Sequence, residues 1–423
     1  MTTLRRRAAA AIALVLAASI AGSGLASTPP PGGGQPAKKD RGLREVLLVG
    51  NNWEGTADVI RPRGKFRRLA RINIIPDIEE RMAEIATDPE RLGYFLAIRE
   101  LVGEGNDQFV DDMYTSNDGR LLVVSRPSLR DVVALDLRSG EIAWRFVVDG
   151  QRSDHMGISP NGRHVAVSAS TGNVVHILDI RTGEEVARFE SGDSPHENTY
   201  SADGERIYHA SIGLVYTPAD QPTFDTSKGD RWFQIVDANT NQIIERVDMG
   251  ANLAEAGYPG MSSAVRPMAI SANERKVYLQ VSFFHGFVEY DLERDRVTRV
   301  ANLPISEEAR QLSREQYLLD SAHHGIALSG DGRRLCVAGT MSDYAAIVSR
   351  RSFRYTLIEA GEKPYWSTTS ANGRRCYVSW SGTDQISVIS YRKRKEIARI
   401  DVGDHPQRIR TGTVRRSWVR AQR

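Results

Sequence analysis

The stretch DHMGISPNGRHVAVSASTGNVVHILDIRTGEEVARFESGD, residues 154–193, contains four short apolar segments separated by turn residues. The turns are Pro160-Asn161-Gly162, Thr171-Gly172-Asn173 and Arg181-Thr182-Gly183. Turn residues about every 8–12 positions between β-branched runs predict a four-stranded antiparallel meander. A single sheet of this kind leaves two faces and two edges exposed, so it requires neighbouring sheets.

The same arrangement recurs along the chain. Six units begin at residues 109, 153, 194, 265, 322 and 363, and each leads through a turn into an apolar strand. Uninterrupted units are 41–43 residues long, the length of a propeller blade. Segments 45–51, 57–61 and 68–74 supply three strands of a seventh blade, and residues 405–412 resemble its inner strand. We therefore expect an all-β, seven-bladed β-propeller over residues 43–414, closed by pairing of the N- and C-terminal strands.

The first 26 residues have the pattern of a secretory signal peptide. Arg5, Arg6 and Arg7 precede an apolar run at 8–21, and small residues favour cleavage after Ala26. An uncleaved N-terminal anchor is the alternative. The apolar run is short for a membrane span, so we expect a secreted or extracytoplasmic protein with no integral span after cleavage. Residues 27–42 are predicted to be a flexible Pro/Gly linker, and residues 415–423 a basic, solvated tail.

The net charge of the chain limits the kinds of partner that it can bind. Removal of the three signal arginines from a formal net charge of +3 leaves a mature chain near neutrality. No nucleic-acid partner is expected from this balance, and a monomer is expected.

When Gly332 is aligned with Gly373, Cys336 and Cys376 fall on opposite faces of equivalent strands. This register predicts two buried free thiols.

Several insertions interrupt the repeat, and we expect them all on one face of the propeller. Residues 89–102 are predicted to form a helix capped by Asp88, and residues 306–320 a second helix capped by Ser306. Residues 211–230 are long and irregular, and residues 251–263 form a smaller insertion. The connections that they occupy emerge on the same rim, which is where a site is expected.

Polar residues at the start of the inner strands are expected to converge on the propeller axis at this rim. In blade order they are Asp111/Asp112, Asp154/His155, His196/Glu197, Arg266/Pro267, His323/His324, Tyr365/Trp366 and Gln407/Arg408. Trp53 and His285 lie in loops on the same face. These residues predict a polar pocket for a small molecule or a protein partner. The candidate ligand-binding residues are Asp111, Asp112, Asp154, Trp53, Arg266, Tyr365 and Arg408.

The histidines suggest metal chemistry. Imidazoles from adjacent blades with a nearby carboxylate suit a divalent transition metal such as Zn²⁺ or Cu²⁺, and the candidate ligands are His155, His196, His323 and His324. The alternative is a wet rim in which they bind only water or carboxylates. For catalysis, His155 or His196 would act as general base, oriented by Glu197 or Asp154. Arg266 and Arg408 would hold a carboxylate or phosphate; the alternative is that they only neutralise neighbouring acids.

The motifs ISPNGRHVAVSASTGNVVHILDIRTGEEVARF and IALSGDGRRLCVAG resemble the YVTN-type, or YncE-like, β-propeller repeat. Proteins of this type are similar in fold to the quinoprotein amine dehydrogenase heavy chain. The resemblance covers about residues 43–412 and implies a seven-bladed, usually exported propeller. Related propellers include the copper-binding N-terminal domain of nitrous-oxide reductase, the haem d1 domain of cytochrome cd1 nitrite reductase, and propeller lactonases and lyases. The mixed rim of His, Asp, Arg and Tyr departs from an all-His copper ring.

Two functions follow from these observations. In the first, the protein is an exported binding module that captures a small molecule or protein partner at its capped top face. In the second, it is a metal-assisted hydrolase or lyase that uses the cluster of His, Glu and Arg in the same pocket. A redox subunit is disfavoured because the sequence has no cofactor attachment motif.

Overall fold

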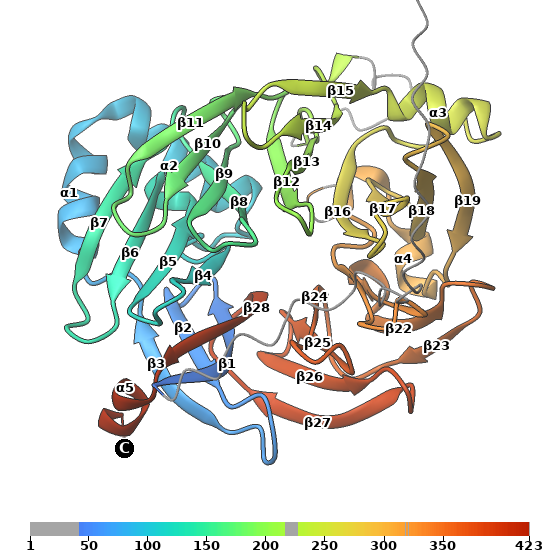
Figure 1. Cartoon of the computed structure of the whole chain (residues 1–423). Helices are drawn as coiled ribbons and strands as arrows, with labels where there is room; N and C mark the ends of the chain where they lie inside the picture. Colours follow the sequence, from blue (N-terminus) through green and yellow to red (C-terminus); the bar gives the residue numbers. More distant parts are fainter. Residues whose placement is uncertain (1–41, 216–226, 318, 320, 423) are drawn as a thin grey trace, which may run out of the picture.

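Seven four-stranded antiparallel sheets form a closed ring in the computed structural model, which describes residues 42–215, 227–317, 319 and 321–422 (Figure 1). The predicted seven-bladed propeller is therefore confirmed. No helix in the described part of the chain is long and apolar enough to cross a membrane. The predicted signal peptide and nearly all of the predicted linker lie outside the described residues.

Each blade has the strand order expected from the sequence repeat, from the axis outward. The inner strands are β28 (Pro406–Arg415), β4 (Met113–Thr115), β8 (Ser153–Ile158), β12 (Pro195–Tyr200), β16 (Val265–Ile270), β20 (Ile326–Leu328) and β24 (Pro364–Thr369). The second strands are β1 (Leu43–Asn51), β5 (Leu121–Arg126), β9 (His164–Ala169), β13 (Arg206–Ser211), β17 (Lys276–Val281), β21 (Arg334–Gly339) and β25 (Arg375–Trp380). The third strands are β2 (Thr56–Ile60), β6 (Asp131–Asp136), β10 (Val174–Asp179), β14 (Phe233–Asp237), β18 (Gly286–Asp291), β22 (Tyr344–Ser349) and β26 (Gln385–Ser390). The outer strands are β3 (Arg68–Asn73), β7 (Ile142–Val147), β11 (Glu185–Glu190), β15 (Ile243–Val247), β19 (Arg296–Asn302), β23 (Tyr355–Ile358) and β27 (Lys395–Asp401).

The ring closes by pairing the two ends of the propeller. Strand β28 is antiparallel to β1, with Thr411 opposite Leu47 and Ile409 opposite Val49. The red C-terminal strand thus lies beside the blue N-terminal strand (Figure 1). One blade is built from three N-terminal strands and one C-terminal strand, as predicted. This closure removes the two free edges that an open array would expose.

The core lies between the blades. The second and third strands are largely buried on both faces, because each blade is covered by a neighbour on either side. One cluster joins the first two blades through Leu48, Val59 and Val124, all of them fully buried. Burial of this apolar surface is the main force that holds adjacent blades together.

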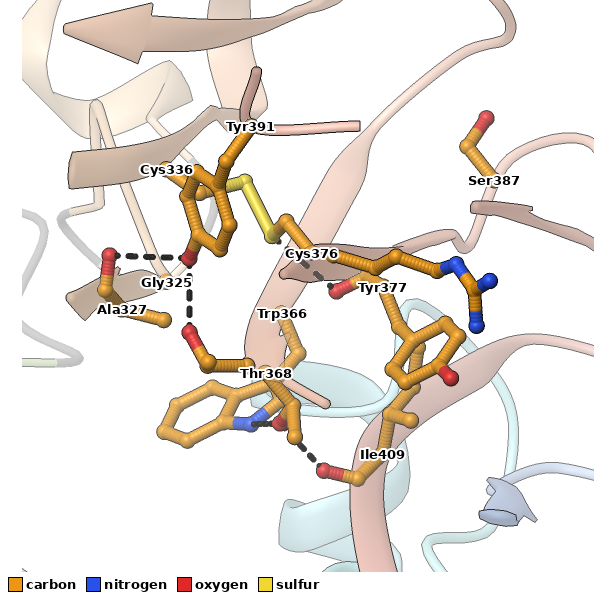
Figure 2. Close-up of a disulfide and its surroundings, with 12 residues drawn as sticks. Gly325, Ala327, Cys336, Trp366, Thr368, Cys376, Tyr377, Ser387, Tyr391 and Ile409 are labelled. Carbon is orange, nitrogen blue, oxygen red and sulfur yellow. Dashed lines mark hydrogen bonds between the residues drawn. A yellow bond between two sulfur atoms is a disulfide. The ribbon is translucent and has the colours of Figure 1, made fainter. Parts of the chain in front are cut away.

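Cys336 of β21 and Cys376 of β25 form a disulfide, which corrects the prediction of two free thiols (Figure 2). The thiols do leave opposite faces of equivalent strands, as the sequence alignment indicated. The error was in the next step: adjacent blades stack so that opposite faces meet. Residues on opposite faces of neighbouring blades therefore face each other, and the two Cα atoms are 6.4 Å apart.

The insertions contain short helices. Helix α2 (Pro89–Leu101) begins at the predicted cap, where the Asp88 carboxylate accepts hydrogen bonds from the N–H groups of Glu90 and Arg91. A preceding helix, α1 (Ile78–Thr87), was not predicted. The second predicted helix is wrong in length: α4 (Glu307–Gln311) ends at Leu312, whose backbone is extended, and a 3₁₀ turn (Arg314–Gln316) follows.

Two further α-helices lie in the described part of the chain, together with short 3₁₀ turns at Pro127–Leu129 and Thr340–Ser342. Helix α3 (Met249–Glu255) begins the smaller insertion and is capped by Asp248. Helix α5 (Arg416–Ala421) occupies much of the predicted solvated tail. Val419 of α5 is buried against the closing blade, so this segment packs on the propeller. Residues 216–226 of the irregular insertion lie outside the described part of the chain.

Candidate functional site

Bulges at the start of the inner strands aim polar side chains at the propeller axis. In β8 the ladder to β9 shifts between Ser153 and Met156, so two residues, Asp154 and His155, oppose one. Similar shifts surround His196 in β12 and Tyr365 in β24. A bulge bends a strand and redirects its side chains, and bulges are common beside functional sites.

Three histidines meet at this point. One ring nitrogen from each of His155, His196 and His324 lies within 4.8 Å of the other two. The ring centroids of His155 and His196 are 3.8 Å apart, and those of His196 and His324 are 5.5 Å apart. Nitrogen ligands on one tetrahedral zinc are about 3.3 Å apart, so the imidazoles would close by at most about 1.5 Å around an ion.

These imidazoles are buried in their neutral form, and two of them have a nitrogen without a described hydrogen-bond partner. Burial, together with nearby arginines, lowers the pKa of His155, His196 and His324 well below 6.5. The buried Nδ1 atoms of His196 and His324 have no hydrogen-bond partner among the described residues. Neutral imidazoles are the form that binds metal. A buried nitrogen without a partner requires water or another ligand.

Glu197 orients His155. Its Oε2 lies 3.0 Å from His155 Nδ1, which leaves the Nε2 side of the ring toward Asp154, whose Oδ1 is 3.6 Å away. Burial raises the pKa of the Glu197 carboxyl to about 7, although Arg408 opposes the shift. A carboxylate behind a ligating imidazole fixes its ring and raises its basicity in many metal sites.

The histidines line a small, capped cavity. Its volume, counted as space for the centre of a water-sized sphere, is about 20 Å³, enough for an ion or one to two waters. Apolar side chains from the insertions contribute to its wall: Val102, Ile212, Val215 and Leu319. The prediction that the insertions gather over the axial site is confirmed for these residues. The small volume favours an ion or a very small ligand over a large one.

Both acidic and basic side chains surround the three-histidine cluster. Arg152 Nη1 lies 2.9 Å from Asp154 Oδ2, and Asp111 lies close enough to Asp154 and His155 to form a second possible ligand set. Arg266 donates a hydrogen bond to Ser282 Oγ and another to the Leu319 carbonyl. Burial raises the pKa of Asp111 to about 7, and Arg408 opposes this shift.

Arg408 is the most unusual of these residues. It is fully buried, yet none of its three guanidinium nitrogens has a hydrogen-bond partner in the described structure. The guanidinium lies 3.7 Å from the ring centroid of Trp366, and its Nε lies 3.8 Å from Asp111 Oδ1. A buried charge held only by a long ion pair and an aromatic ring is costly. It is well placed to bind an anion or ordered water.

Three of the predicted site residues, Asp112, Trp53 and His323, lie apart from the cluster. Both oxygens of Asp112 accept hydrogen bonds from Arg410, so this pair fills a structural role. Trp53 stacks on His405, with ring centroids 3.7 Å apart. His323 Nε2 is 3.0 Å from the Tyr344 hydroxyl, and its ring neighbours His285 rather than the three-histidine cluster. Tyr365 does line the cavity, 4.3 Å from the His324 ring centroid.

Two polar residues of the cavity were not predicted. Gln108 lies three positions before Asp111, and Arg152 lies two positions before Asp154, the first residues that the repeat alignment selected in their blades. Their position relative to the repeat was the available signal. The apolar residues that cover the cavity could not be identified in this way, because the sequence does not show whether a Val or Leu covers a site or packs in the core.

Comparisons with known proteins establish the fold alone. No known family profile matches the sequence, and no curated protein matches it. Among solved structures 1629 chains match, so the architecture is common. A chain of hydrazine synthase from Kuenenia stuttgartiensis aligns with a TM-score of 0.53 and 15% identity, covering 70% of this chain and 88% of that one. Such a likeness supports the propeller and carries no activity with it.

Proposed function

We propose that this protein is an exported propeller that binds a divalent transition metal at its capped axial site and presents that ion to a small ligand. The observation that carries the proposal is the buried cluster of neutral His155, His196 and His324, with nitrogens within 4.8 Å of one another. Three histidines leave a fourth position open, as in catalytic zinc sites. Glu197 supplies the carboxylate behind one ligand.

Export is part of this proposal. Its supports are the signal-like N-terminus and the disulfide between Cys336 and Cys376, because disulfides persist mainly in oxidising compartments. The YVTN-type assignment is also part of it, supported by the repeat motifs quoted above. The propeller and its axial pocket do not depend on either point.

The test is metal analysis of the untagged mature protein. After exposure to Zn²⁺, Cu²⁺, Co²⁺ or Mn²⁺ and removal of excess ion, we expect about one tightly bound ion per chain, with an N-ligand preference for Zn²⁺ or Cu²⁺. A folded variant carrying His155→Ala and His196→Ala should retain none. Equal retention by the variant and the parent protein would contradict the proposal.

Metal-assisted hydrolysis or elimination is the second candidate. The observation that favours it is the placement of Arg408 and of carboxyl groups whose pKa is about 7, Asp111 and Glu197, around an open ligand position. Groups that titrate near neutrality suit proton transfer. Metal-loaded protein should then turn over simple lactones or esters, and Asp111→Asn should lower that rate without loss of the ion. Metal binding without turnover would leave the first function standing alone.

A further inference from the structure

A strongly basic groove lies on the face of the propeller opposite the capped site. We define the basic groove by six arginines: Arg333, Arg334, Arg350, Arg351, Arg354 and Arg394. They lie in or beside the turns between β20 and β21, β22 and β23, and β26 and β27. The inner strands start at the capped face and the strands of a blade alternate in direction. The turns after the first and the third strand of each blade therefore lie on the opposite face. The groove has a volume of about 1160 Å³, and its lining comes from three consecutive blades.

The positive charge of the basic groove is only partly offset within the described structure. None of its six arginines forms an ion pair with a described residue. Of the two acids of the groove, Glu289 is already engaged in ion pairs, and Asp331 offsets part of the charge through its attraction to Arg333 and Arg334. Glu289 is paired with Arg299 and Lys276, and the Asp331 carboxylate accepts hydrogen bonds from the Ser329 hydroxyl and the Arg333 N–H. A mature chain near neutrality therefore concentrates cations at one place.

The turn that carries half of these arginines is held rigidly. Arg299 donates hydrogen bonds to the carbonyl oxygens of Arg350 and Arg351, and its guanidinium stacks 3.9 Å from the ring centroid of Phe353. Glu289 fixes the same guanidinium from the other side. The binding arginines are thus presented on a preorganised backbone, which reduces the entropy cost of binding.

The chemistry of the basic groove indicates its ligand. Arginine binds carboxylates through two parallel N–H donors, which lysine cannot do. The concave shape suits an extended chain better than a flat membrane surface. Tyr355, 44% exposed, is the one large apolar side chain of the groove that is exposed in the described residues, so there is little to insert into a bilayer. We propose that the basic groove binds an acidic polypeptide segment, rich in Asp and Glu, of a partner protein.

This site is independent of the axial metal, because it lies on the other face. The probe is a fluorescein-labelled oligoglutamate of about 16 residues, which has a length of about 50 Å when fully extended at about 3.3 Å per residue. Fluorescence anisotropy of the full mature protein measures its binding at low and at physiological salt. We expect saturable binding that weakens with salt.

The decisive comparison uses two matched triple variants. The groove variant carries Arg351→Gln, Arg354→Gln and Arg394→Gln. The control carries Arg138→Gln, Arg163→Gln and Arg181→Gln, which remove three equally exposed arginines from turns of other blades on the same face. Because all six positions are exposed, both variants should fold, as circular dichroism will show. We expect a loss of affinity of about tenfold or more for the groove variant and less than about twofold for the control.

Three results would overturn the proposal. The first is absence of peptide binding by the parent protein. The second is an equal loss in both triple variants, which would indicate diffuse charge attraction. The third is binding to vesicles of phosphatidylglycerol and phosphatidylcholine without binding to the peptide, which would indicate a membrane surface.

Discussion

His155 Nδ1 lies 3.0 Å from Glu197 Oε2, and this contact joins two adjacent blades at the propeller axis. Both side chains are buried. His155 belongs to the inner strand β8, and Glu197 belongs to β12, the inner strand of the adjacent blade. The contact assigns one nitrogen of the ring to the carboxyl group and leaves the other for a ligand. It is the relationship on which the proposed metal site depends most.

Removal of the Glu197 charge should weaken metal binding without loss of the fold. Glutamine preserves the shape of the side chain and a hydrogen bond to His155, so we expect Glu197→Gln to lower affinity about 10- to 100-fold. Chelator competition measures this constant. The matched control is Glu185→Gln. Glu185 Oε1 lies 3.1 Å from His176 Nδ1, and this similar Glu–His pair is in the outer part of a blade, away from the axis. Equal affinities for the two variants would exclude an orienting role for Glu197.

Two adjacent histidines should behave differently. His324 belongs to the cluster, whereas His323 binds the Tyr344 hydroxyl. We expect His324→Ala to weaken metal binding by at least about 100-fold, because one of three ligands is lost. His323→Ala should change it less than about threefold. Isothermal titration of both variants provides the comparison, and a large loss for His323→Ala alone would refute the assignment of ligands.

We expect Arg408 to lower the free energy of unfolding of the protein rather than raise it. Its guanidinium is fully buried with no hydrogen-bond partner among the described residues, whereas the equally buried Arg126 donates to both Asp77 and Asp131. We expect Arg126→Met to lower the free energy of unfolding by about 3–5 kcal/mol. Arg408→Met should leave it unchanged or raise it, since its partner Asp111 can become protonated. Urea denaturation tests this contrast, and similar losses in both variants would show that Arg408 is a structural residue.

The disulfide should stabilise the propeller. It links residues 40 positions apart, and closure of a loop of this length in the unfolded chain is worth about 4 kcal/mol. The variant with Cys336→Ala and Cys376→Ala should therefore unfold at lower urea concentration. Thiol labelling of the unreduced, denatured parent protein should find no free cysteine. Two labelled thiols per chain would contradict the disulfide directly.

Acid should destabilise the fold through its buried histidines. Burial lowers the pKa of His209 to about 3; its Nδ1–H donates to Asn198 Oδ1, and its Nε2 accepts a hydrogen bond from the Ser191 hydroxyl. The unfolded state binds a proton below about pH 6.5, but the folded state does so only near pH 3. The contribution of His209 to stability is thus complete above pH 6.5 and is lost as the pH falls toward 3.

The measurement is the free energy of unfolding at several pH values. His209→Gln should show a shallower loss between pH 6.5 and 3 than the parent protein, because glutamine does not titrate. His164→Gln serves as a control on the partly exposed start of β9. If both variants keep the slope of the parent protein, His209 is not the group responsible.

Local sequence was sufficient for the architecture. The turn at Pro160-Asn161-Gly162 and its equivalents mark the end of each inner strand, so the repeat length and the split blade could both be recognised. The cap at Asp88 was recognised for the same reason. Helix α4 was predicted too long because the choice between continuing at Leu312 and stopping there depends on the surface beneath it.

The site was predictable by position but not by contact. The repeat placed His155, His196 and His324 at the starts of inner strands, seven or eight positions before the turn glycine, and the ring of blades brings them together. It could not separate His323 from His324, because bulges and strand starts set which of two successive side chains faces the axis. Nor did it pair Cys336 with Cys376, since that pairing depends on how neighbouring blades stack.

The most direct test of the central claim is the position of a bound ion. Crystals of the mature protein soaked with Zn²⁺ give an anomalous difference map at the zinc absorption edge. We predict one strong peak on the propeller axis, about 2.1 Å from a nitrogen of each of His155, His196 and His324. A map with no peak there, or with its peak between Asp111 and Asp154 and away from His196 and His324, would contradict the account.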